Sequence, residues 1–369
     1  MVLIPQAAPA LRFARFREAI EPRILGVLGG SQYILGAEVA RFEKDFAAYL
    51  GVRHCIGVNS GTDAMMLALR ALDLGAGDEV LTVSLTAAGT VMPVLHVNAT
   101  PQFVDVDPRT RCIDLDLVEA AITPRSRAIL PVHLHGFPVD MPRLMEIAHR
   151  HGLAVIEDCA QAHGARVGGR FAGAFGDAAI FSFYPTKNLG CIGDGGAVVT
   201  NDDRVAERVR ALRELGWQDR RRISSGLGYN SRLDELQAAV LNALLPHLDD
   251  YNRERVAIAD EYRRLLDPAS LELPPTHRGA VYHQFAVTAP MRDLLRSELR
   301  SRADIDTAVH YEIPLHRQPL FAPFASRPLP ATERLAETML SLPIQPEVAN
   351  GKISYVAEAV AKASRQCRA

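Results

Sequence analysis

Three short segments of the sequence carry residue types that could do chemistry. In the first, Gly61 and Thr62 lie between an expected strand over residues 54–58 and an expected helix over residues 62–71. The free N–H groups and the dipole of a helix N-terminus attract an anion, so a glycine followed by a hydroxyl residue suits a phosphate group. A plain helix cap remains the alternative for this segment, because Ser and Thr are common at that position.

The second segment is an apolar run that ends in two carboxylates, Glu157 and Asp158. A carboxylate at the C-terminal end of a parallel strand faces the crevice in which α/β proteins bind ligands. Its best use there would be to keep a heterocyclic ring nitrogen protonated, so that the ring can accept electrons. An ion pair or a loop cap is the alternative when this segment is considered alone.

The third segment places Lys187 just beyond an expected strand over residues 178–183 and 29 residues after Asp158. Ser182 precedes the lysine, and a glycine-rich turn at residues 193–196 follows it. A lysine buried among apolar strands loses proton affinity and becomes a nucleophile toward an aldehyde, whereas a lone lysine is usually a solvated surface charge. Together, and in this order, the segments indicate a phosphate site, an acid for a ring nitrogen and a reactive amine.

Short apolar strands that alternate with helices would position these segments. The strands are expected near residues 54–58, 79–83, 100–106, 127–130, 153–159, 178–183 and 196–200. Their apolar character is continuous rather than alternating, which predicts a mostly parallel sheet that is buried on both faces by helices. The predicted fold class is therefore α/β, with a mostly parallel, mixed sheet sandwiched by helices.

The character of the chain changes near residue 235, where a long charged amphipathic helix begins that we expect to break near Pro246. Beyond it, residues 281–289 are expected to form a strand and residues 333–340 a helix. We predict a large domain over residues 1–245 and a smaller α+β domain over residues 246–369.

Composition and charge exclude several classes of protein. The 369 residues include 41 Lys and Arg against 43 Asp and Glu, and the net charge of −2 argues against attachment to nucleic acid or to an anionic membrane. The five cysteines are widely spaced and form no CxxC pair, so we expect no disulfide framework, no metal site and a reducing, cytoplasmic location. The N-terminus lacks the apolar core of a signal peptide. The uncharged stretch over residues 80–104 contains Gly, Pro, His and Asn, and is expected to form a strand, a helix and a strand rather than a membrane span.

Common nucleotide and hydrolase motifs are also missing from the sequence. There is no GxGxxG after a strand, no glycine-rich loop ending in Gly-Lys-Ser/Thr, no HExxH and no GxSxG. The missing motifs argue against four classes of protein: nicotinamide enzymes, P-loop nucleotidases, zinc proteases of the HExxH type and α/β-hydrolases.

The sequence as a whole resembles the DegT/StrS-type sugar aminotransferases, a pyridoxal 5′-phosphate (PLP) family with the aspartate aminotransferase fold, type I. The resemblance extends over nearly the whole chain, from Ile34-Leu35-Gly36 to the LSLP motif at residues 340–343. It is carried by NSGTDA (59–64), IEDCAQAHGA (156–165), FSFYPTKNLGCIGDGG (181–196), GYNSRLDELQAA (228–239), VYHQF (281–285) and VHYEIPLHRQP (309–319). On this resemblance the large domain is the PLP-binding domain.

The resemblance implies a role for each matching position. Lys187 and Asp158 are the implied catalytic residues: the lysine forms a Schiff base with PLP and later moves the proton, and the aspartate pairs with the pyridine nitrogen. The implied cofactor-binding residues are these two together with Gln161 near the ring hydroxyl, Gly61, Thr62 and Ser182 at the phosphate, and Asn230. Asn230 is the residue that a partner subunit lends to the phosphate, which implies a homodimer with shared active sites. The implied substrate contacts are Tyr184, Arg232, His310, Tyr311 and His316.

Three positions depart from the family pattern. Ala87 stands where many relatives have an aromatic residue that stacks on the cofactor ring, so another group must supply that contact or it is partly lost. Glu312 replaces a proline that usually follows His-Tyr, and Gln345 replaces a histidine that usually follows LSLP. The last two lie on the expected substrate side.

The implied activity is PLP-dependent transamination of a nucleotide-linked keto sugar, with L-glutamate as the amino donor, in amino-sugar biosynthesis. The form of the TKNLG and GDGG motifs is similar to enzymes that convert a 3-keto sugar into a 3-amino sugar. Amination at C4 and amination of a ketocyclitol are the alternatives within the family. Relatives that dehydrate sugars have histidine in place of the lysine, and a non-catalytic regulatory or binding protein of this fold would be expected to lose Lys187 or Asp158.

Overall fold

A seven-stranded sheet forms the centre of the large N-terminal part of the chain. The computed structural model describes residues 3–217, 221–269 and 271–366. The strands are β1 (His54–Val58), β2 (Glu79–Val83), β3 (Thr100–Val104), β4 (Ser126–Ile129), β5 (Ala154–Asp158), β8 (Ala178–Ser182) and β9 (Gly196–Thr200). Their order is β1-β9-β8-β5-β4-β2-β3. β9 is antiparallel to β1 and β8, and the other neighbours are parallel, which confirms the predicted mostly parallel, mixed sheet.

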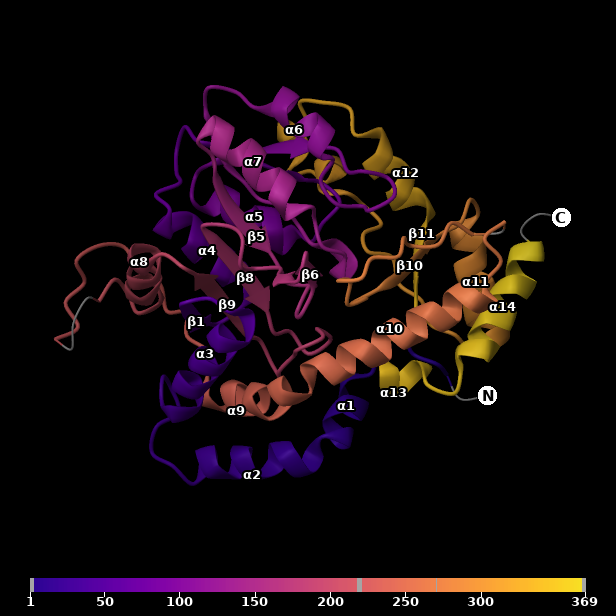
Figure 1. Cartoon of the computed structure of the whole chain (residues 1–369), viewed down its shortest axis with the longest axis horizontal. Coiled ribbons are helices and arrows are strands. Elements are labelled where there is room, and N and C mark those ends of the chain that lie inside the picture. The colour runs from indigo at the N-terminus through magenta and orange to yellow at the C-terminus, as the bar shows by residue number, and fades with distance from the viewer. Residues whose placement is uncertain (1–2, 218–220, 270, 367–369) are drawn as a thin grey trace.

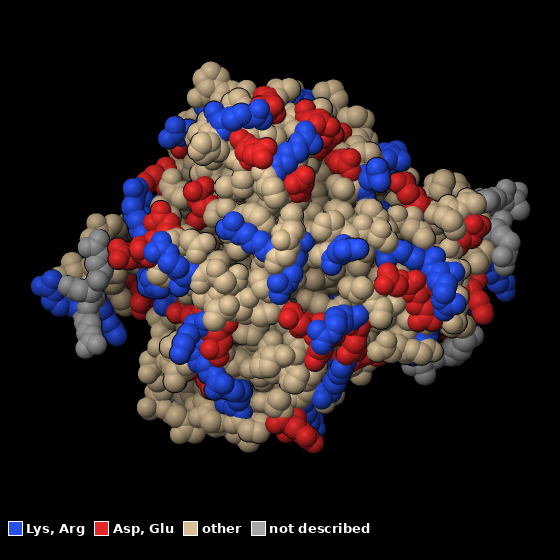
Figure 2. Space-filling model, viewed as in Figure 1, with Lys and Arg blue, Asp and Glu red and all other residues tan. Residues whose placement is uncertain are grey.

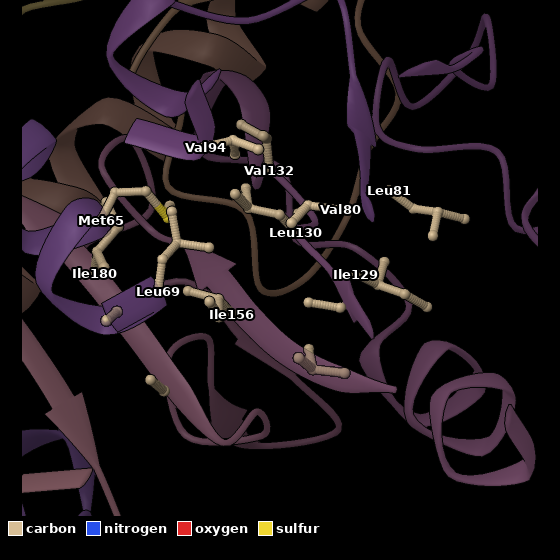
Figure 3. Close-up of a cluster of buried hydrophobic side chains, with 14 of the residues drawn as sticks. Met65, Leu69, Val80, Leu81, Val94, Ile129, Leu130, Val132, Ile156 and Ile180 are labelled. Carbon is tan, nitrogen blue, oxygen red and sulfur yellow. The ribbon is translucent and has the colours of Figure 1, made fainter. Parts of the chain in front are cut away.

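Helices cover both faces of the sheet, as the continuous apolar strands predict (Figure 1). They are α3 (Ala37–Leu50), α4 (Gly61–Ala71), α5 (Ala88–His96), α6 (Leu115–Ala121), α7 (Met141–His151), α8 (Asp203–Arg213) and α9 (Glu235–Leu244). In β8, Ile180 packs in one apolar cluster with Met65 and Leu69 of α4 (Figure 3). The next residue, Phe181, packs in a second cluster, which contains residues of α3 and α9. Successive strand residues are thus buried on opposite faces.

The uncharged stretch over residues 80–104 forms β2, α5 and β3, so the expectation of a strand, a helix and a strand is confirmed. No helix within residues 3–217, 221–269 and 271–366 combines the length and the apolar character that crossing a bilayer requires. On the face shown in Figure 2, Lys and Arg side chains are mixed with Asp and Glu side chains rather than gathered in one patch.

The amphipathic helix beyond residue 235 breaks where proline predicts. α9 ends at Leu244, a 3₁₀ turn covers Leu245–His247, and α10 (Leu248–Leu265) continues toward the C-terminal part (Figure 1). Proline lacks the N–H that an α-helix needs at this point and clashes with the preceding turn. The division between residues 245 and 246 remains a prediction.

The C-terminal part packs helices around a two-stranded antiparallel sheet. Its strands are β10 (Phe285–Thr288) and β11 (Met339–Leu342), and its helices are α10, α11 (Arg292–Ala303), α12 (Pro330–Thr338), α13 (Pro346–Ala349) and α14 (Ile353–Gln366). The strand expected over residues 281–289 is therefore shorter than predicted. The helix expected over residues 333–340 was wrong at its end, because Met339 and Leu340 pair with β10 instead of continuing α12.

Smaller elements complete the fold. The helices α1 (Pro9–Arg15) and α2 (Arg17–Leu28) precede α3, and β6 (Arg166–Val167) pairs with β7 (Arg170–Phe171). Further 3₁₀ turns cover Leu134–Gly136, Leu315–Arg317 and Ala322–Phe324. The N-terminal segment also contacts the C-terminal part, because the backbone of Ile4 exchanges hydrogen bonds of 2.8 Å with Asp304 and Asp306.

Candidate active site

The three segments singled out in the sequence meet in one cavity of about 400 Å³. It lies where β5 ends at Asp158, where β8 ends at Ser182 and where α4 begins at Gly61. Among the site residues predicted from the sequence, the cavity is lined by Gly61, Thr62, Asp158, Gln161, Ser182, Tyr184, Lys187, His310 and Tyr311. The cavity opens at the carboxyl ends of parallel strands, the usual place for a ligand in an open α/β sheet.

The start of α4 offers the features of a phosphate site. Ser60 is the N-cap, and its Oγ accepts a hydrogen bond of 3.1 Å from the N–H of Asp63. The N–H groups of Gly61 and Thr62 are in the first helical turn, where no intrahelical acceptor exists. A Cβ atom on Gly61 would lie 2.7 Å from Cβ of Ser182, so the glycine lets the helix start approach the end of β8. Backbone donors and the Ser182 hydroxyl can therefore converge on one small anion.

Asp158 is held by two donors at the floor of the cavity. Its Oδ2 accepts a hydrogen bond of 2.8 Å from the hydroxyl of Thr90, and its Oδ1 accepts one of 3.0 Å from the N–H of Ala160. Thr86 lies 2.8 Å from Thr90, so its hydroxyl can donate to Thr90 while Thr90 donates to the carboxylate. Burial raises the pKa of Asp158, while Ala160, Thr90 and the charge of Lys187 act in the opposite direction. A cationic group bound beside this carboxylate would favour its ionised form.

Lys187 lies in the loop between β8 and β9, and we call residues 184–190 the lysine loop. Burial lowers the pKa of Lys187 to about 8, although the carboxylate of Asp158 favours the charged amine. The N–H of Lys187 donates to the carbonyl of Tyr184 at 2.9 Å, which closes a turn around the lysine. A lysine with this pKa has a far larger neutral fraction near physiological pH than an ordinary lysine, and its neutral form can act as a nucleophile or a base.

Gln161 is held in one orientation on the side of the cavity toward the C-terminal part of the chain. Its Oε1 accepts a hydrogen bond of 2.6 Å from the N–H of His135, and its Nε2 donates to the hydroxyl of Tyr311 at 3.2 Å. His135 has a left-handed backbone conformation with φ of 59°, and its Nε2 lies 3.1 Å from the carbonyl of His310. These hydrogen bonds connect the Gln161 side chain to the segment that carries His310 and Tyr311.

The two carboxylates at the end of β5 have different surroundings. Glu157 is buried among structural partners: its Oε1 accepts from the N–H groups of Phe175 and Gly176, and its Oε2 accepts from Gly173 and lies 3.1 Å from His133 Nε2. These donors keep the pKa of Glu157 below its ordinary value, although burial acts in the opposite direction. Only Asp158 of this pair lines the cavity.

Three predicted site residues lie outside the cavity. His316 is buried between Ser84, whose Oγ is 2.7 Å from its Nδ1, and Glu333, whose Oε1 is 3.1 Å from its Nε2. Asn230 is exposed and forms a backbone bridge with Glu214, and Arg232 follows it two residues later. The structure therefore does not bring His316, Asn230 or Arg232 together with Lys187 in one chain.

Other cavity residues were given no role from the sequence, although Ser60, Asp194, His283 and Gln284 lie within the quoted motifs. They are Gln6, Ser60, Gly89, Thr90, Asp194, His283 and Gln284, besides Ala87, which was noted only as a departure. Thr90 could have been suggested by its position in the first turn of the helix after β2. Gln6 and Gln284, joined by a hydrogen bond of 2.6 Å, come from segments 278 residues apart, and no local pattern links them.

Neither Gln345 nor Glu312, two of the departures from the family pattern, lines the cavity. Gln345 is buried, and its side chain accepts from the N–H of Ala8 at 2.8 Å and donates to the carbonyl of Ala8 at 2.9 Å. Glu312 is exposed, and its Oε2 lies 3.7 Å from Arg296 Nη1. Ala87, in contrast, lines the cavity at the N-cap of α5.

A known protein family matches a range of this chain that includes all three segments of the cavity. The profile of the DegT/DnrJ/EryC1/StrS aminotransferase family matches residues 15–361. The chain belongs to this family. It is an aminotransferase with the α/β fold of the family, as the resemblance of its motifs implies.

Individual members of the family and solved structures match this chain over most of their lengths. The UDP-N-acetyl-3-dehydro-α-D-glucosamine 3-aminotransferase of Acidithiobacillus ferrooxidans is 46% identical over 360 residues, which are 97% of this chain and 97% of that protein. The structure of S. venezuelae DesV in complex with a ketimine intermediate has a TM-score of 0.95 and 45% identity, and the match covers 99% of both chains. The structure of ntda from Bacillus subtilis with the bound cofactor PMP has a TM-score of 0.93 and 32% identity, and the match covers 99% of this chain and 86% of that one.

Proposed function

We propose that this aminotransferase uses PLP to move an amino group from L-glutamate to C3 of a 3-keto sugar linked to a nucleoside diphosphate, as a step of amino-sugar biosynthesis. The observation that carries the proposal is that Lys187 and Asp158 line the same cavity, beside the start of α4. The 46% identity to a 3-aminotransferase that acts on a UDP-linked 3-dehydro sugar supports C3 as the position. The binding of PMP by the related ntda protein supports the cofactor.

The side chains and backbone groups that line the cavity fit the chemistry of PLP. The first turn of α4, together with Thr62 and Ser182, would hold the phosphate, and the lack of a side chain on Gly61 lets the start of the helix lie against Ser182. Asp158 would hold the ring nitrogen, and Gln161, whose orientation is set by His135, would lie by the ring hydroxyl. When bound, PLP supplies an aldehyde that takes up the amino group and a protonated ring that accepts electrons.

Lys187 is the residue that moves the proton in this proposal. Its Nζ is neutral in part near pH 8, so it can take a proton from the α-carbon of the donor, hold it and later release it. Because the cavity fixes both the amine and the phosphate site, the proton moves between groups that are already positioned.

Asp158 would stabilise a protonated ring nitrogen of the bound cofactor. Burial alone raises the pKa of this carboxyl, and the cost of its negative charge falls when a protonated ring nitrogen lies beside it. Thr90 and Ala160 keep both carboxylate oxygens in place, so the orientation of the acid is set before the cofactor arrives.

The side of the cavity toward the C-terminal part would receive glutamate and the keto sugar in turn. It is lined by His283, Gln284, His310 and Tyr311, to which Gln6 and Tyr184 are added. Burial lowers the pKa of His310 to about 4, so its ring is neutral at pH 7 and can both donate and accept hydrogen bonds. Neutral donors and acceptors of this kind suit the hydroxyl and carbonyl groups of a sugar.

The proposal also includes a homodimer in which Asn230 completes the phosphate site of the partner subunit. Asn230 is exposed and does not line the cavity of its own chain, which is what a residue lent to a second subunit requires. Arg232 and His316 do not line the cavity of a single chain, and we propose that Arg232, like Asn230, contributes to the site of the partner subunit.

Four buried free cysteines, at positions 55, 112, 159 and 191, favour a reducing compartment, so we place the enzyme in the cytoplasm, with no nucleic acid or membrane partner.

The experiment that tests the proposed function is a substrate panel. The cofactor-loaded protein is incubated with L-glutamate and with UDP-, dTDP- or GDP-linked 3-keto and 4-keto sugars or a ketocyclitol, and NMR locates the new amine. We expect the amine at C3 and none in the reaction of the Lys187→Ala variant. Amination only at C4, or only of the ketocyclitol, would contradict the proposed substrate.

A further inference from the structure

A buried arginine from the N-terminal segment contacts the lysine loop from outside the cavity. Arg12 lies in α1, 175 residues before Lys187, and is 3% exposed. Its Nη1 donates to the carbonyl oxygens of Lys187 at 2.6 Å and Asn188 at 3.4 Å. Its Nη2 donates to the carbonyl oxygens of Pro185 at 2.6 Å and Gly190 at 3.3 Å. One guanidinium therefore contacts four carbonyl groups around the active-site lysine.

These contacts matter because the lysine loop lies outside the helices and strands. It lies between β8 and β9, where no sheet partner takes its carbonyl groups, and buried carbonyl groups need a donor. A guanidinium presents its N–H groups as a rigid planar fork, whereas the ammonium of a lysine is a point charge on a flexible stem. The bonds go to the backbone of Lys187 itself, so they fix the point from which its side chain extends.

The loop is adapted to this close approach. A Cβ atom on Gly190 would lie 2.8 Å from Nη2 of Arg12 and 2.5 Å from the carbonyl oxygen of Tyr184. The Asn188 side chain of the loop donates a hydrogen bond to the Asn252 side chain at 2.9 Å. Arg12 and Asn188 thus hold the loop at separate points, and among the residues that the structure describes only Arg12 bonds to the backbone of Lys187 through its side chain.

The charge of Arg12 has no carboxylate partner in an ion pair within the described part of the chain, and burial lowers its pKa. The carbonyl dipoles of the lysine loop, the rings of Phe13 and Tyr251, whose centroids lie 5.2 and 5.8 Å from the guanidinium carbon, and the charge of Glu347 stabilise the buried cation. A buried charge is an expensive way to gain stability, since apolar residues of similar volume often stabilise as well or better. Its four carbonyl contacts point instead to a role in the geometry of the lysine loop.

We propose that Arg12 is a positioning residue, which holds the backbone of Lys187 so that the amine is delivered into the cavity beside Asp158. This inference rests on the proposed function, in which Lys187 carries the cofactor. Arg12 itself does not line the cavity and acts through the lysine loop.

The test uses the full chain with Arg12→Lys, which keeps the charge but loses the fork, and Arg12→Gln, which keeps one amide donor pair. Arg15→Lys is the matched control, because Arg15 ends the same helix but is partly exposed and pairs with Glu254 at 2.5 Å. In the first measurement, cofactor-free protein is treated with acetic anhydride over a range of pH, and mass spectrometry follows acetylation of Lys187. The wild type and Arg15→Lys should react with a midpoint near pH 8. In the Arg12 variants the released amine reaches water, so the midpoint should rise toward that of an ordinary lysine.

The second measurement is steady-state kinetics of the loaded enzyme. We expect kcat of Arg12→Lys to fall by about a hundredfold, because a displacement of about 1 Å at the reacting group costs that much, while KM for glutamate stays close to the wild-type value. Variants that fold and load cofactor but keep the wild-type midpoint and kcat would overturn the proposal. Loss of the fold in both variants would also overturn it, since Arg12 would then be a purely structural residue. If the wild type aminates none of the tested keto sugars but the midpoint still rises in Arg12→Lys, the proposed function fails and the positioning role stands.

Discussion

At the scale of single residues, burial acts on Asp158 and Lys187 in opposite directions. It raises the pKa of the acid and lowers that of the amine, to about 8, so the cavity disfavours both charges. Each shift in pKa suits the proposed chemistry. A partly neutral amine can attack an aldehyde, and a buried carboxylate whose negative charge is unfavourable is strongly stabilised by a protonated ring nitrogen beside it. The site is therefore prepared for the cofactor at some cost to the stability of the cofactor-free protein.

This cost predicts that Asp158→Asn stabilises the cofactor-free protein while it lowers activity. The folded-state pKa of Asp158 is raised, so its contribution to stability is present below the ordinary Asp pKa and is lost as the pH rises through the raised value. Asparagine is neutral at every pH, and its advantage should be largest near pH 7 and should vanish in acid. Thermal melting of cofactor-free wild type and variant across pH measures the difference. The kcat of the loaded variant should fall at least about a hundredfold, because the ring loses the charge that keeps it protonated.

A variant that melts below the wild type at pH 7, with the gap unchanged in acid, would contradict this interpretation of Asp158. Thr90→Val is the matched control, since it removes the hydroxyl that donates to Asp158 at 2.8 Å but leaves the carboxylate. Losing a donor to the ionised acid should destabilise the cofactor-free protein at pH 7.

Residue types and order in the sequence located the proposed catalytic pair, Lys187 and Asp158, but not the residues that support it. Lys187, Asp158 and Gly61 each follow or precede a strand that the sequence marks clearly, so their meeting at one edge of the sheet could be predicted. Arg12 and Gln6 reach the site from the N-terminal segment, and only tertiary contacts bring them there. His316 matched the family motif but is held by Ser84 and Glu333, a pairing that no spacing in the sequence indicates.

At the scale of elements, the cavity depends on how closely α4 starts beside the end of β8. Gly61 allows this approach, because a side chain there would collide with Ser182. The elements that create this geometry were predictable from their apolar runs, whereas β11 was not. Its first residues continue the periodicity of α12, and the pairing with β10 overrides that local preference.

We predict that Gly61→Ala lowers the affinity for PLP by tenfold or more and also destabilises the protein. The added Cβ would lie 2.7 Å from Cβ of Ser182, so α4 or β8 must shift and the phosphate site must widen. Titration of cofactor-free protein with PLP measures the first effect, and thermal melting measures the second.

Gly26→Ala is the matched control for this substitution. Gly26 lies inside α2 with nothing within 4 Å of the position of a Cβ, so alanine there should stabilise the protein by up to about 1 kcal/mol and leave PLP affinity unchanged. Equal PLP affinity in Gly61→Ala and wild type would show that α4 does not form the phosphate site.

At the scale of the whole molecule, the proposed active site extends beyond one chain. Asn230 is exposed and lies away from the cavity lining, and several large apolar side chains are exposed near the N-terminal helices, at Leu25, Leu28, Tyr33 and Ile34. Contiguous exposed apolar side chains often mark a protein interface. The motif GYNSR matches the family, but the sequence does not indicate whether Asn230 contributes to the site of its own chain or to that of a partner. The dimer with shared sites is therefore part of the proposed function.

Subunit mixing tests this shared site. Lys187→Ala and Asn230→Ala chains should each be nearly inactive alone, but in a mixed dimer one site has the lysine of one chain and the asparagine of the other. After complete exchange at equal concentrations, about a quarter of the wild-type activity should return, because half of the dimers are mixed and each has one intact site. Exchange is confirmed by differently tagged chains. Full exchange without recovered activity would contradict shared sites.

The central claim, that Lys187 is the amine that holds the cofactor, is tested most directly by reduction and peptide mapping. Cofactor-free protein is incubated with PLP and reduced with sodium borohydride, and mass spectrometry locates the attached pyridoxyl phosphate. The account predicts one modified residue, Lys187, with a yield that rises as the pH passes through about 8, and no specific modification in Lys187→Ala. Attachment at another lysine, or equal labelling of wild type and variant, would contradict it.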